Sequence, residues 1–348
     1  MSQRVIKGVD FFCSGGGMTN GMRSAGINVI AGIDYDPECK ATYESNNIGS
    51  EFILADIFTL KEEDLEKQLS LKRNDNNLLF IGCSPCQFWS IIRTDKRKSE
   101  QSKDLLGEFS RFVKYFNPGF VVVENVPGIA TRKDESGLTA FANDLTNRGY
   151  KVKFKVVNLN EYGVPQTRKR FSLVASRVTT EEVFPSPSKA AKPTVKDFLG
   201  KQNGFPKITA GHRDESDFNH SVAKLSDKNL ERLIGTPTNG GNAIWWRTDK
   251  KLGRAKYTGD GFKDSYSRMC WDKAAPTITT KFFSISNGRF AHPEEHRAIS
   301  IREGATLQTF PKNYIFHATS MQSAARMIGN AVPPEYARRI GKAIINSK

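Results

Sequence analysis

The sequence predicts an α/β protein with a doubly wound, mostly parallel sheet and a second, smaller, loop-rich part. In the first half, short apolar runs alternate with segments of helical periodicity, which is the pattern of repeated βαβ units. After about residue 178 this alternation stops, and the Pro- and Lys-rich stretch FPSPSKAAKPTV (184–195) indicates a linker. The length of 348 residues also favours one large domain with a smaller one appended.

Seven strands are predicted, each from a short apolar run. The runs LLFI and FVVV are apolar throughout, which is typical of central strands that are buried on both faces. In order, the predicted strands are 6–12, 28–34, 51–56, 78–82, 120–125, 151–159 and 170–176.

Helical segments connect these strands, and their ends carry recognisable signals. MTNGMRSAG ends near Gly26, the residue type preferred just past a helix C-terminus. PECKATYESN has proline at its start, where a missing N–H is tolerated. DLLGEFSRFVKYF (104–116) repeats apolar residues at helical spacing, and further helices are predicted near 136–148 and within GNAVPPEYARRIGKAII.

The charge is strongly unbalanced along the chain. The protein has 52 Lys and Arg against 37 Asp and Glu, a net charge of +15, which favours a polyanionic partner through counterion release. The alternative is a soluble protein with surplus surface lysines. Residues 181–290 contain 19 basic and 12 acidic side chains, a net of +7. We therefore expect a sheet domain over 1–180, a basic domain over 181–290, and a segment over 291–348 that returns to the first domain.

Three consecutive glycines, Gly15, Gly16 and Gly17, follow the first predicted strand. Glycine allows positive φ and lets the backbone approach a ligand closely. The spacing does not match the dinucleotide fingerprint, but acids end the next two strands, Asp34 and Asp56. This pattern suits an adenosine-containing cofactor such as S-adenosylmethionine. The alternative is a tight turn followed by two solvated acids.

The segment IGCSPCQFWS (81–90) contains two cysteines, Cys83 and Cys86. Their spacing fits a redox dithiol, half of a zinc site, or one catalytic thiol with a bystander. A redox pair is disfavoured because the chain continues as a basic loop rather than a clean helix. Zinc would need His292 and His296, which are far more distant in sequence than a compact finger allows. A nucleophilic Cys86 at the carboxyl end of a strand fits best, since ligands bind at that edge.

Four motifs occur in order along the chain. They are PCQ (85–87) after the fourth strand, ENV (124–126) after the fifth, QTRKR (166–170) before the seventh, and GNAVPP (329–334) near the C-terminus. Together with the glycine turn, they resemble the DNA cytosine-5 methyltransferases of bacterial and phage restriction–modification type. The resemblance covers nearly the whole chain apart from about 185–270.

The resemblance implies a fold and a domain organisation. The expected fold is the Rossmann-like sheet of the S-adenosylmethionine-dependent methyltransferases. Residues 1–180 would form the catalytic and cofactor-binding domain, and 181–290 the target-recognition domain.

The resemblance also implies catalytic residues. Cys86 would add to C6 of cytosine, which makes C5 nucleophilic. Glu124 would stabilise the charge that develops at N3. Arg170 would contact the ring oxygen of the base, while Arg168 steadies the site. Since the target base cannot react inside a duplex, it is expected to flip out of the helix.

Binding residues follow from the same resemblance, and no metal site is expected. The expected cofactor-binding residues are Phe12, Gly16, Gly17, Asp34, Tyr35, Asp56, Ile57, Asn330 and Val332. The expected DNA-binding residues are Gln87, Arg93, Lys96, Arg97, Lys98 and Gln166. Arg247, Arg254 and Arg268 are candidates for reading bases within the recognition domain.

The segment HPEEHRAISIREGATLQTFP (292–311) resembles a family segment that organises the recognition domain. His292 and His296 would then be structural, and Arg297 and Arg302 would form internal ion pairs, with Glu303 as a partner. The sequence departs from the family at Ser14, where glycine is usual, and at Phe88 and Trp89. Cys83 receives no role.

The leading hypothesis is a sequence-specific enzyme that makes 5-methylcytosine in double-stranded DNA and protects host DNA, with a separate restriction endonuclease as partner. Two alternatives are a tRNA cytosine-5 methyltransferase and a catalytically silent DNA-binding regulator. The long basic region favours DNA, and the intact catalytic set favours an enzyme. We expect a monomer, since one base is flipped per molecule. The five cysteines and the lack of any long apolar run predict a cytoplasmic protein with reduced thiols.

Overall fold

The computed structural model describes residues 5–84, 104–242 and 264–348. The chain forms two compact units. Unit 1 consists of Met1–Tyr162, Lys169–Pro187 and Ala331–Lys348, and unit 2 consists of Gly163–Arg168 and Ser188–Asn330. This division differs from the one expected from sequence, because residues 291–330 belong to unit 2 and only the end of the chain returns to unit 1.

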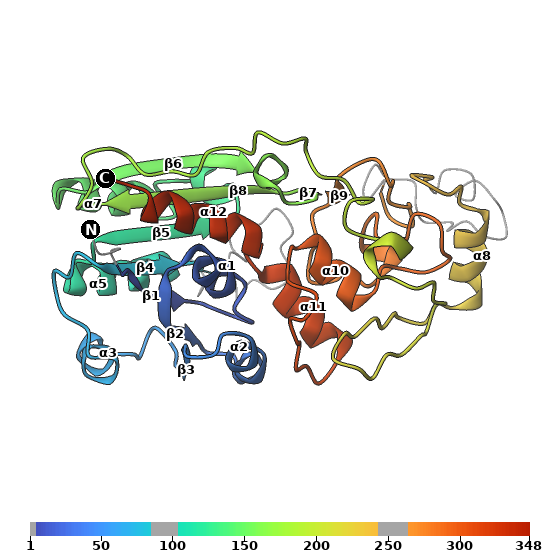
Figure 1. Ribbon diagram of the computed structural model, residues 1–348, viewed down its shortest axis with the longest axis horizontal. Coiled ribbons are helices and arrows are strands. Elements are labelled where there is room, and N and C mark those ends of the chain that lie inside the picture. Colours follow the sequence, from blue (N-terminus) through green and yellow to red (C-terminus); the bar gives the residue numbers. More distant parts are fainter. Residues whose placement is uncertain (1–4, 85–103, 243–263) are drawn as a thin grey trace. The chain divides into compact units, whose positions relative to one another are not determined.

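Unit 1 is built on a seven-stranded sheet with the order β3-β2-β1-β4-β5-β8-β6 (Figure 1). Strands β1 to β5 pair in parallel, whereas β8 runs antiparallel to both β5 and β6. The predicted α/β class and the seven predicted strands are confirmed. The strands are β1 (Lys7–Phe11), β2 (Asn28–Asp34), β3 (Glu51–Leu54), β4 (Leu78–Gly82), β5 (Phe120–Asn125), β6 (Lys151–Asn158) and β8 (Lys169–Ser176).

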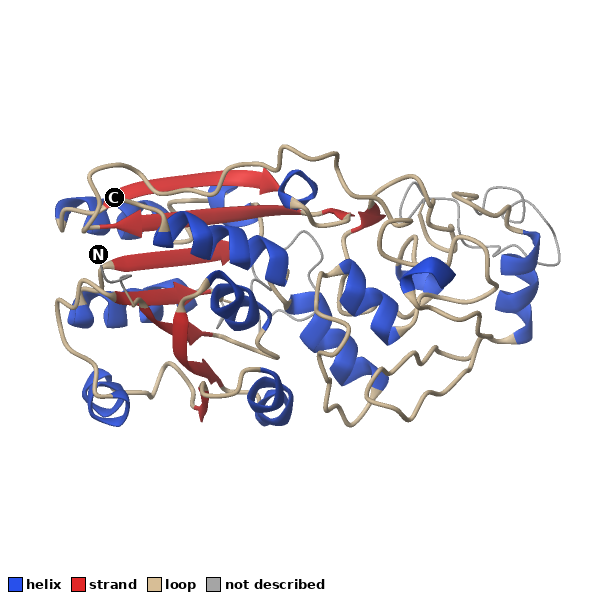
Figure 2. Cartoon of the chain, viewed as in Figure 1, coloured by secondary structure: helices blue, strands red, loops and turns tan. Residues whose placement is uncertain are grey.

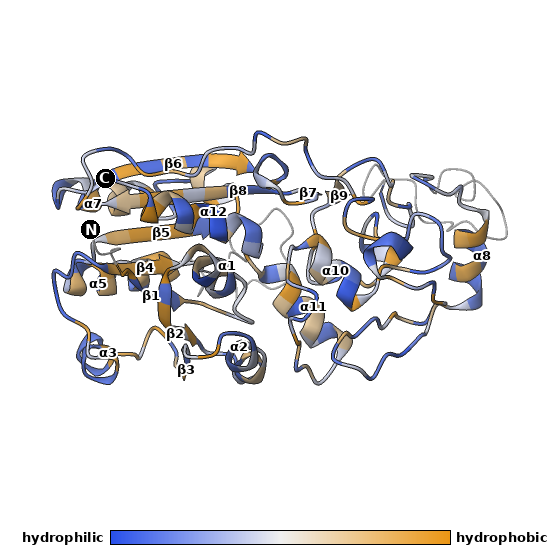
Figure 3. Cartoon of the chain, viewed as in Figure 1, coloured by the Kyte–Doolittle hydropathy of each residue, from blue (hydrophilic) through white to orange (hydrophobic). Residues whose placement is uncertain are grey.

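The central strands β4 and β5 are hydrophobic along almost their whole length (Figure 3). Every residue of both strands is buried, as expected for strands covered on both faces. The helices and short 3-10 turns of unit 1 are α1 (Gly17–Ala25), η1 (Pro37–Cys39), α2 (Lys40–Asn46), α3 (Glu62–Leu69), α5 (Leu105–Phe116), α6 (Gly128–Thr131), α7 (Leu138–Asn147), η2 (Leu159–Tyr162) and α12 (Pro334–Ile345).

The strands send alternate side chains to two different layers. Val121 and Val123 of β5, and Phe171 and Leu173 of β8, join one core cluster with residues of α5 and α7. Because side chains alternate along a strand, the residues between them face the opposite side. Side chains of α1 and α12 contact that side, through hydrogen bonds to strands β1 and β8.

Helices α1 and α12 come from opposite ends of the chain and pack side by side within unit 1. Small residues make this close contact possible. A side chain at Gly21 would overlap Pro334 and Ala337, and one at Gly341 would overlap Ala25. The amphipathic helix predicted near the C-terminus therefore does pack back on the sheet domain.

Loops dominate unit 2, whereas helices and strands dominate unit 1 (Figure 2). Four fully buried arginines, Arg168, Arg268, Arg297 and Arg302, lie in this loop-rich unit. The described elements of unit 2 are β7 (Gln166–Thr167), η3 (Lys201–Asn203), α8 (Asp227–Gly235), β9 (Ala275–Pro276), η4 (Ile285–Asn287), α10 (Ile301–Leu307) and α11 (Met321–Asn330). Within the described ranges, no helix has the length and apolar character needed to span a bilayer.

Candidate active site

The carboxyl ends of β4 and β5 lie next to each other in the parallel sheet. Glu124 and Asn125 end β5, and both are buried. The Asn125 amide donates to the Ser84 hydroxyl at 3.3 Å, which joins the end of β5 to the segment that follows β4. The side-chain oxygen of Asn125, Oδ1, accepts a hydrogen bond from the backbone N–H of Val126 at 2.8 Å. The buried amide therefore fixes the start of both loops at this edge.

The predicted nucleophile lies outside the described residues. Cys86 follows Ser84 by two positions, so the chain that carries it leaves the sheet at the edge just described. Cys83 is half-buried, and its backbone N–H donates to the carbonyl of Phe11 on β1. Five predicted DNA contacts also fall outside the described ranges, namely Gln87, Arg93, Lys96, Arg97 and Lys98, as do the candidates Arg247 and Arg254.

Glu124 forms an ion pair with Arg170. The Nε of Arg170 lies 3.1 Å from the Glu124 carboxylate, and the two side chains are 14% and 9% exposed. The pairing of β5 with β8 produces this contact, because it places Glu124 opposite Ser172, two residues from Arg170. A carboxyl group and a guanidinium thus meet in a largely dry position at the sheet edge. Such a pair can bind a polar heterocycle and stabilise charge on it.

Arg168 and Gln166 belong to unit 2, and both are buried. The Arg168 guanidinium donates to the carbonyls of Ile278 and Gly329 at 2.9 and 3.1 Å. The Gln166 amide donates to the carbonyl of Leu307 and accepts from the backbone N–H of Ile278. Arg168 therefore braces the backbone, in keeping with a supporting role. The burial of Gln166 speaks against the direct DNA contact expected from sequence.

The loop after β1 has an unusual backbone conformation. Phe12, Ser14 and Gly16 have φ values of 63°, 47° and 85°. Positive φ is uncommon for residues other than glycine, and strain of this kind concentrates at ligand sites. The Asp34 carboxylate holds the loop, since one oxygen accepts the backbone N–H of Ser14 at 2.8 Å. Gly17 then opens α1.

Asp34 sits at the end of β2, half-buried below this loop. Its second carboxylate oxygen accepts the backbone N–H of Asp36 at 3.0 Å. Burial raises the pKa of Asp34, while backbone hydrogen bonds from Asp36 and Ser14 lower it. Each oxygen can accept more than one hydrogen bond, so the carboxylate can still bind a hydroxyl.

Three further predicted cofactor residues follow strands β2 and β3. Tyr35 is 69% exposed, which leaves its ring open to stack on a ligand. Asp56 is exposed and Ile57 is buried beside it. The described residues after β1, β2 and β3 thus converge on one edge of the sheet. Asn330 and Val332 fall on different units, Asn330 exposed at the end of α11 and Val332 buried at the start of the final segment.

Asp10 is not among the residues predicted from the sequence. This residue is fully buried in β1, and the Thr19 hydroxyl of α1 donates to it at 2.7 Å. Burial raises the pKa of Asp10 to about 7. An acidic residue between the apolar residues Val9 and Phe11 of the first strand was the available signal. The Tyr43 hydroxyl lies 3.1 Å from the Thr19 hydroxyl. Asp10, Thr19 and Tyr43 therefore form a buried polar cluster in unit 1.

Arg268 is not available to read DNA. It is fully buried, and its guanidinium donates to four backbone carbonyls, those of Leu233, Thr236, His292 and Glu295. The prediction that this arginine is a base-reading candidate is therefore wrong, because its donors are already used. Burial lowers its pKa to about 10, which still leaves it charged at neutral pH.

The two histidines of segment 292–311 differ, since His292 is buried and His296 is exposed. His292 is buried, its Nδ1 accepts two backbone N–H groups, and burial lowers its pKa to about 4. The Nδ1 of His296 lies 2.7 Å from the Arg268 guanidinium. Arg297 pairs with Glu303 at 2.7 Å as expected, whereas Arg302 donates to backbone carbonyls rather than to an acid.

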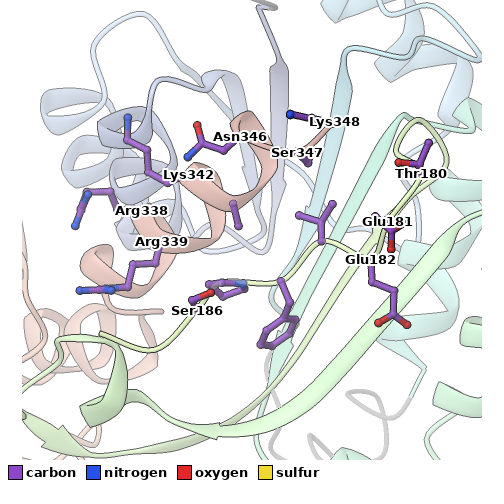
Figure 4. Close-up of a pocket in the computed structure, with 14 residues that line it drawn as sticks. Thr180, Glu181, Glu182, Ser186, Arg338, Arg339, Lys342, Asn346, Ser347 and Lys348 are labelled. Atoms are coloured by element: carbon purple, nitrogen blue, oxygen red, sulfur yellow. The ribbon is translucent and has the colours of Figure 1, made fainter. Parts of the chain in front are cut away.

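A hollow of about 660 Å³ in unit 1 lies away from these groups. It is lined by the segment 180–186 and the end of α12, with Arg338, Arg339 and Lys342 among its side chains (Figure 4). None of the predicted site residues that the structure describes lines it.

Comparison with known proteins identifies the family. The model of the C-5 cytosine-specific DNA methylases matches residues 6–346. The chain belongs to this family. It is 37% identical to the type II methylase M.HgiDII of Herpetosiphon aurantiacus over 97% of this chain and 94% of the relative. It is 30% identical to the type II methyltransferase M1.HphI of Haemophilus parahaemolyticus over 97% of this chain and 86% of the relative.

Solved structures agree with the fold. A DNA modification methyltransferase encoded within an E. coli prophage superposes with a TM-score of 0.76 at 22% identity, over 98% of this chain and 99% of that one. The protein is therefore a DNA cytosine-5 methyltransferase, and the family resemblance noted in the sequence is confirmed. Family membership implies DNA as the substrate and S-adenosylmethionine as the methyl donor.

Proposed function

We propose that this methyltransferase modifies C5 of a cytosine flipped out of double-stranded DNA, through a covalent bond from Cys86 to C6. The observation that carries this proposal is the Glu124–Arg170 ion pair, which is largely shielded from solvent and lies at the edge formed by the carboxyl ends of β4 and β5. The proposal extends to a defined recognition sequence and to protection of host DNA, because the relatives are type II methylases.

The chemistry needs a nucleophile and an acid on opposite sides of one ring system. Attack of the Cys86 thiolate on C6 pushes the electron pair of the C5–C6 double bond towards C5, and charge spreads to N3 and O2. Bound S-adenosylmethionine supplies the methyl group for C5. Loss of the C5 proton and cleavage of the C6–sulfur bond then restore the aromatic ring and free the thiolate.

Glu124 and Arg170 fit the other half of this reaction. Glu124 can protonate N3 or share a short hydrogen bond with it, and Arg170 can bind the oxygen at C2. Their low exposure strengthens both interactions, because water screens them little. Arg168 braces the backbone of unit 2 at Ile278 and Gly329.

The cofactor residues fit an adenosine-containing ligand. The loop 12–16 has positive φ at Phe12, Ser14 and Gly16, and it presents its backbone at the sheet edge. Asp34 can accept hydrogen bonds from ribose hydroxyls. Tyr35 and Ile57 can flank the adenine. Asp56 is then placed to accept from the adenine amino group. Gly16, Gly17, Asn330 and Val332 would complete the cofactor contacts.

The loop of residues 87–103 is our candidate for the phosphate contacts, through Gln87, Arg93, Lys96, Arg97 and Lys98. Unit 2 is our candidate for target recognition. Gln166 and Arg268 are left out of the DNA surface, since their polar atoms are bonded inside unit 2.

Methyl transfer from labelled S-adenosylmethionine tests the proposal. Wild-type protein should label duplex DNA, and bisulfite sequencing should place every modified cytosine in one sequence context. Cys86→Ser should lower the rate on the order of a thousandfold or more, and Cys83→Ala is the matched control that should stay active. Labelling of tRNA alone would replace DNA with the tRNA alternative, and the lack of any labelling would favour the silent DNA-binding regulator.

A further inference from the structure

A pair of buried hydroxyls lies behind Glu124 in unit 1. Tyr336 of α12 is fully buried, and its hydroxyl donates to the Ser172 hydroxyl of β8 at 2.8 Å. Ser172 is also fully buried. Buried hydroxyls are costly unless they are bonded, so this pair has a defined geometry.

Ser172 is the cross-strand partner of Glu124. The antiparallel pairing of β5 and β8 sets the two residues directly opposite each other. Directly opposed side chains lie on the same face of a sheet, with their Cβ atoms about 5 Å apart. Their neighbours Val123 and Leu173 point into the core cluster on the other face. Glu124, Ser172 and Tyr336 therefore share one layer.

The direction of the Tyr336–Ser172 bond leaves a donor for Glu124. A serine hydroxyl has one proton and two lone pairs. Because Tyr336 donates to a lone pair of the Ser172 oxygen, the hydroxyl proton of Ser172 remains available for donation to Glu124. Burial raises the pKa of the Tyr336 phenol, and the nearby Glu124 charge raises it further, so the phenol keeps its proton.

The Tyr336 ring itself is held in place. It meets the ring of Tyr162 edge to face, with centroids 5.2 Å apart. Arg170 also forms an ion pair with the Glu124 carboxylate, at 3.1 Å. We propose that Tyr336 and Ser172 are positioning residues, which together with Arg170 hold the Glu124 carboxyl group in its reactive orientation. This inference rests on the proposed catalytic role of Glu124.

Tyr336→Phe removes one oxygen and keeps the ring. We expect kcat for methyl transfer to fall on the order of tenfold, with KM for DNA and for S-adenosylmethionine unchanged, because only the alignment of Glu124 is disturbed. If the Glu124 carboxylate loses a hydrogen-bond donor, its charged form is less stabilised. The limb of the kcat–pH profile that reports ionisation of Glu124 should then move to higher pH. Ser172→Ala should give the same changes, and the double variant should add nothing.

Tyr162→Phe is the matched control, since it removes a hydroxyl from the neighbouring ring and leaves the bond to Ser172. It should keep the wild-type kcat and pH profile. A Tyr336→Phe protein with wild-type kcat would overturn the inference. A lower kcat with an unmoved pH limb, or one that falls only in step with the melting temperature, would overturn it too, since a structural role explains that result.

The Glu124→Gln background separates this inference from the proposed function. If Glu124 is catalytic, this variant loses activity, and adding Tyr336→Phe should then cause no further loss. A fully active Glu124→Gln protein would refute the role of Glu124 and the inference with it. An inactive Glu124→Gln protein beside an unaffected Tyr336→Phe protein would refute the inference alone.

Discussion

Asp10 in unit 1 and Glu303 in unit 2 are both fully buried carboxyl groups, yet their pKa values move in opposite directions. Burial raises the pKa of Asp10 to about 7. Burial also acts to raise that of Glu303, but the charge of Arg297 and its hydrogen bonds outweigh it, so the pKa of Glu303 falls to about 2. Few polar partners offset the burial of Asp10 in unit 1, whereas Arg297 offsets the burial of Glu303 in unit 2.

The difference reflects how each unit holds its backbone. In unit 1, strand pairing satisfies the hydrogen-bonding groups of the backbone. One carboxylate oxygen of Asp10 has no hydrogen-bond partner among the described residues. Unit 2 has little regular structure, and arginine side chains bind its loop carbonyls instead. Arg268 and Arg302 together bond carbonyls from several separate loops. Charged side chains thus replace strand ladders where loops predominate.

The largest expected effect comes from breaking the buried pair of unit 2. Arg297→Met leaves the buried Glu303 charge without its main partner, so we expect unfolding to become easier by about 3–5 kcal/mol in chemical denaturation. Arg289→Met is the matched control, because Arg289 pairs with Asp264 at the surface and should cost about 1 kcal/mol or less. Equal losses in the two variants would contradict the role given to Arg297.

A smaller loss is expected at Arg268. Arg268→Lys keeps the charge but not the planar set of donors, so some of the four carbonyls lose their partner. We expect about 2–3 kcal/mol less stability at neutral pH, measured by urea denaturation. Arg148→Lys on the exposed end of α7 should leave the midpoint almost unchanged, and a wild-type midpoint for Arg268→Lys would refute the bracing role.

The pH dependence of unit 1 gives the third prediction. Asp10 has a folded pKa of about 7, and an unfolded Asp has a pKa of about 3.9. Between these values the folded state binds one more proton, so the contribution of Asp10 to stability falls as pH rises through about 7. Asp10→Asn mimics the neutral form. Its stability relative to wild type should therefore improve by on the order of 2 kcal/mol between pH 5 and pH 8.

The contribution of Glu303 to stability changes with pH in the opposite direction. Its folded pKa of about 2 lies below the unfolded value, so its contribution is present above about pH 4.5 and is lost as pH falls towards 2. Asp10→Asn should not alter this acid limb. A stability difference between Asp10→Asn and wild type that stays constant from pH 5 to pH 8 would show that Asp10 titrates normally.

The smallest effect is expected at Ser14. Its φ of 47° is strained for serine but not for glycine. Ser14→Gly relieves that strain but gives the unfolded chain more freedom, so the two terms should leave thermal stability within about 1 kcal/mol of wild type. Phe12→Ala is the comparison variant. The affinity for S-adenosylmethionine should weaken in Phe12→Ala and stay unchanged in Ser14→Gly. A large loss of stability in Ser14→Gly would show that the hydroxyl matters.

Local pattern was sufficient to predict the strands and the main helices of unit 1. LLFIG and FVVVEN are apolar enough to be central strands, and Gly26 does end α1. The antiparallel insertion of β8 beside β5 was not predictable, because it depends on pairing between segments about 50 residues apart. That same pairing creates the Glu124–Arg170 contact, so the motifs named both residues but could not place them together.

Buried arginines defeat prediction from sequence for a different reason. Nothing near Arg268 in the chain distinguishes it from a surface arginine, since its carbonyl partners come from residues 233–236 and 292–295. Gln166 presents the same problem, because its amide bonds to backbone more than 100 residues away. Asp10 differs from these, since an acid within an apolar strand was visible in the sequence itself.

The packing of α12 on α1 has a consequence for how the protein is made. Helix α1 leaves the ribosome early, and its partner surface, with Gly21 fitted against Pro334 and Ala337, is synthesised about 300 residues later. Folding of the sheet unit therefore finishes only after α12 (Pro334–Ile345) has been synthesised, and until then one face of α1 lacks its cover. A nascent chain that stops between residues 181 and 290 contains the loop after β1 and Glu124 but not α12, so we expect it to be inactive in methyl transfer.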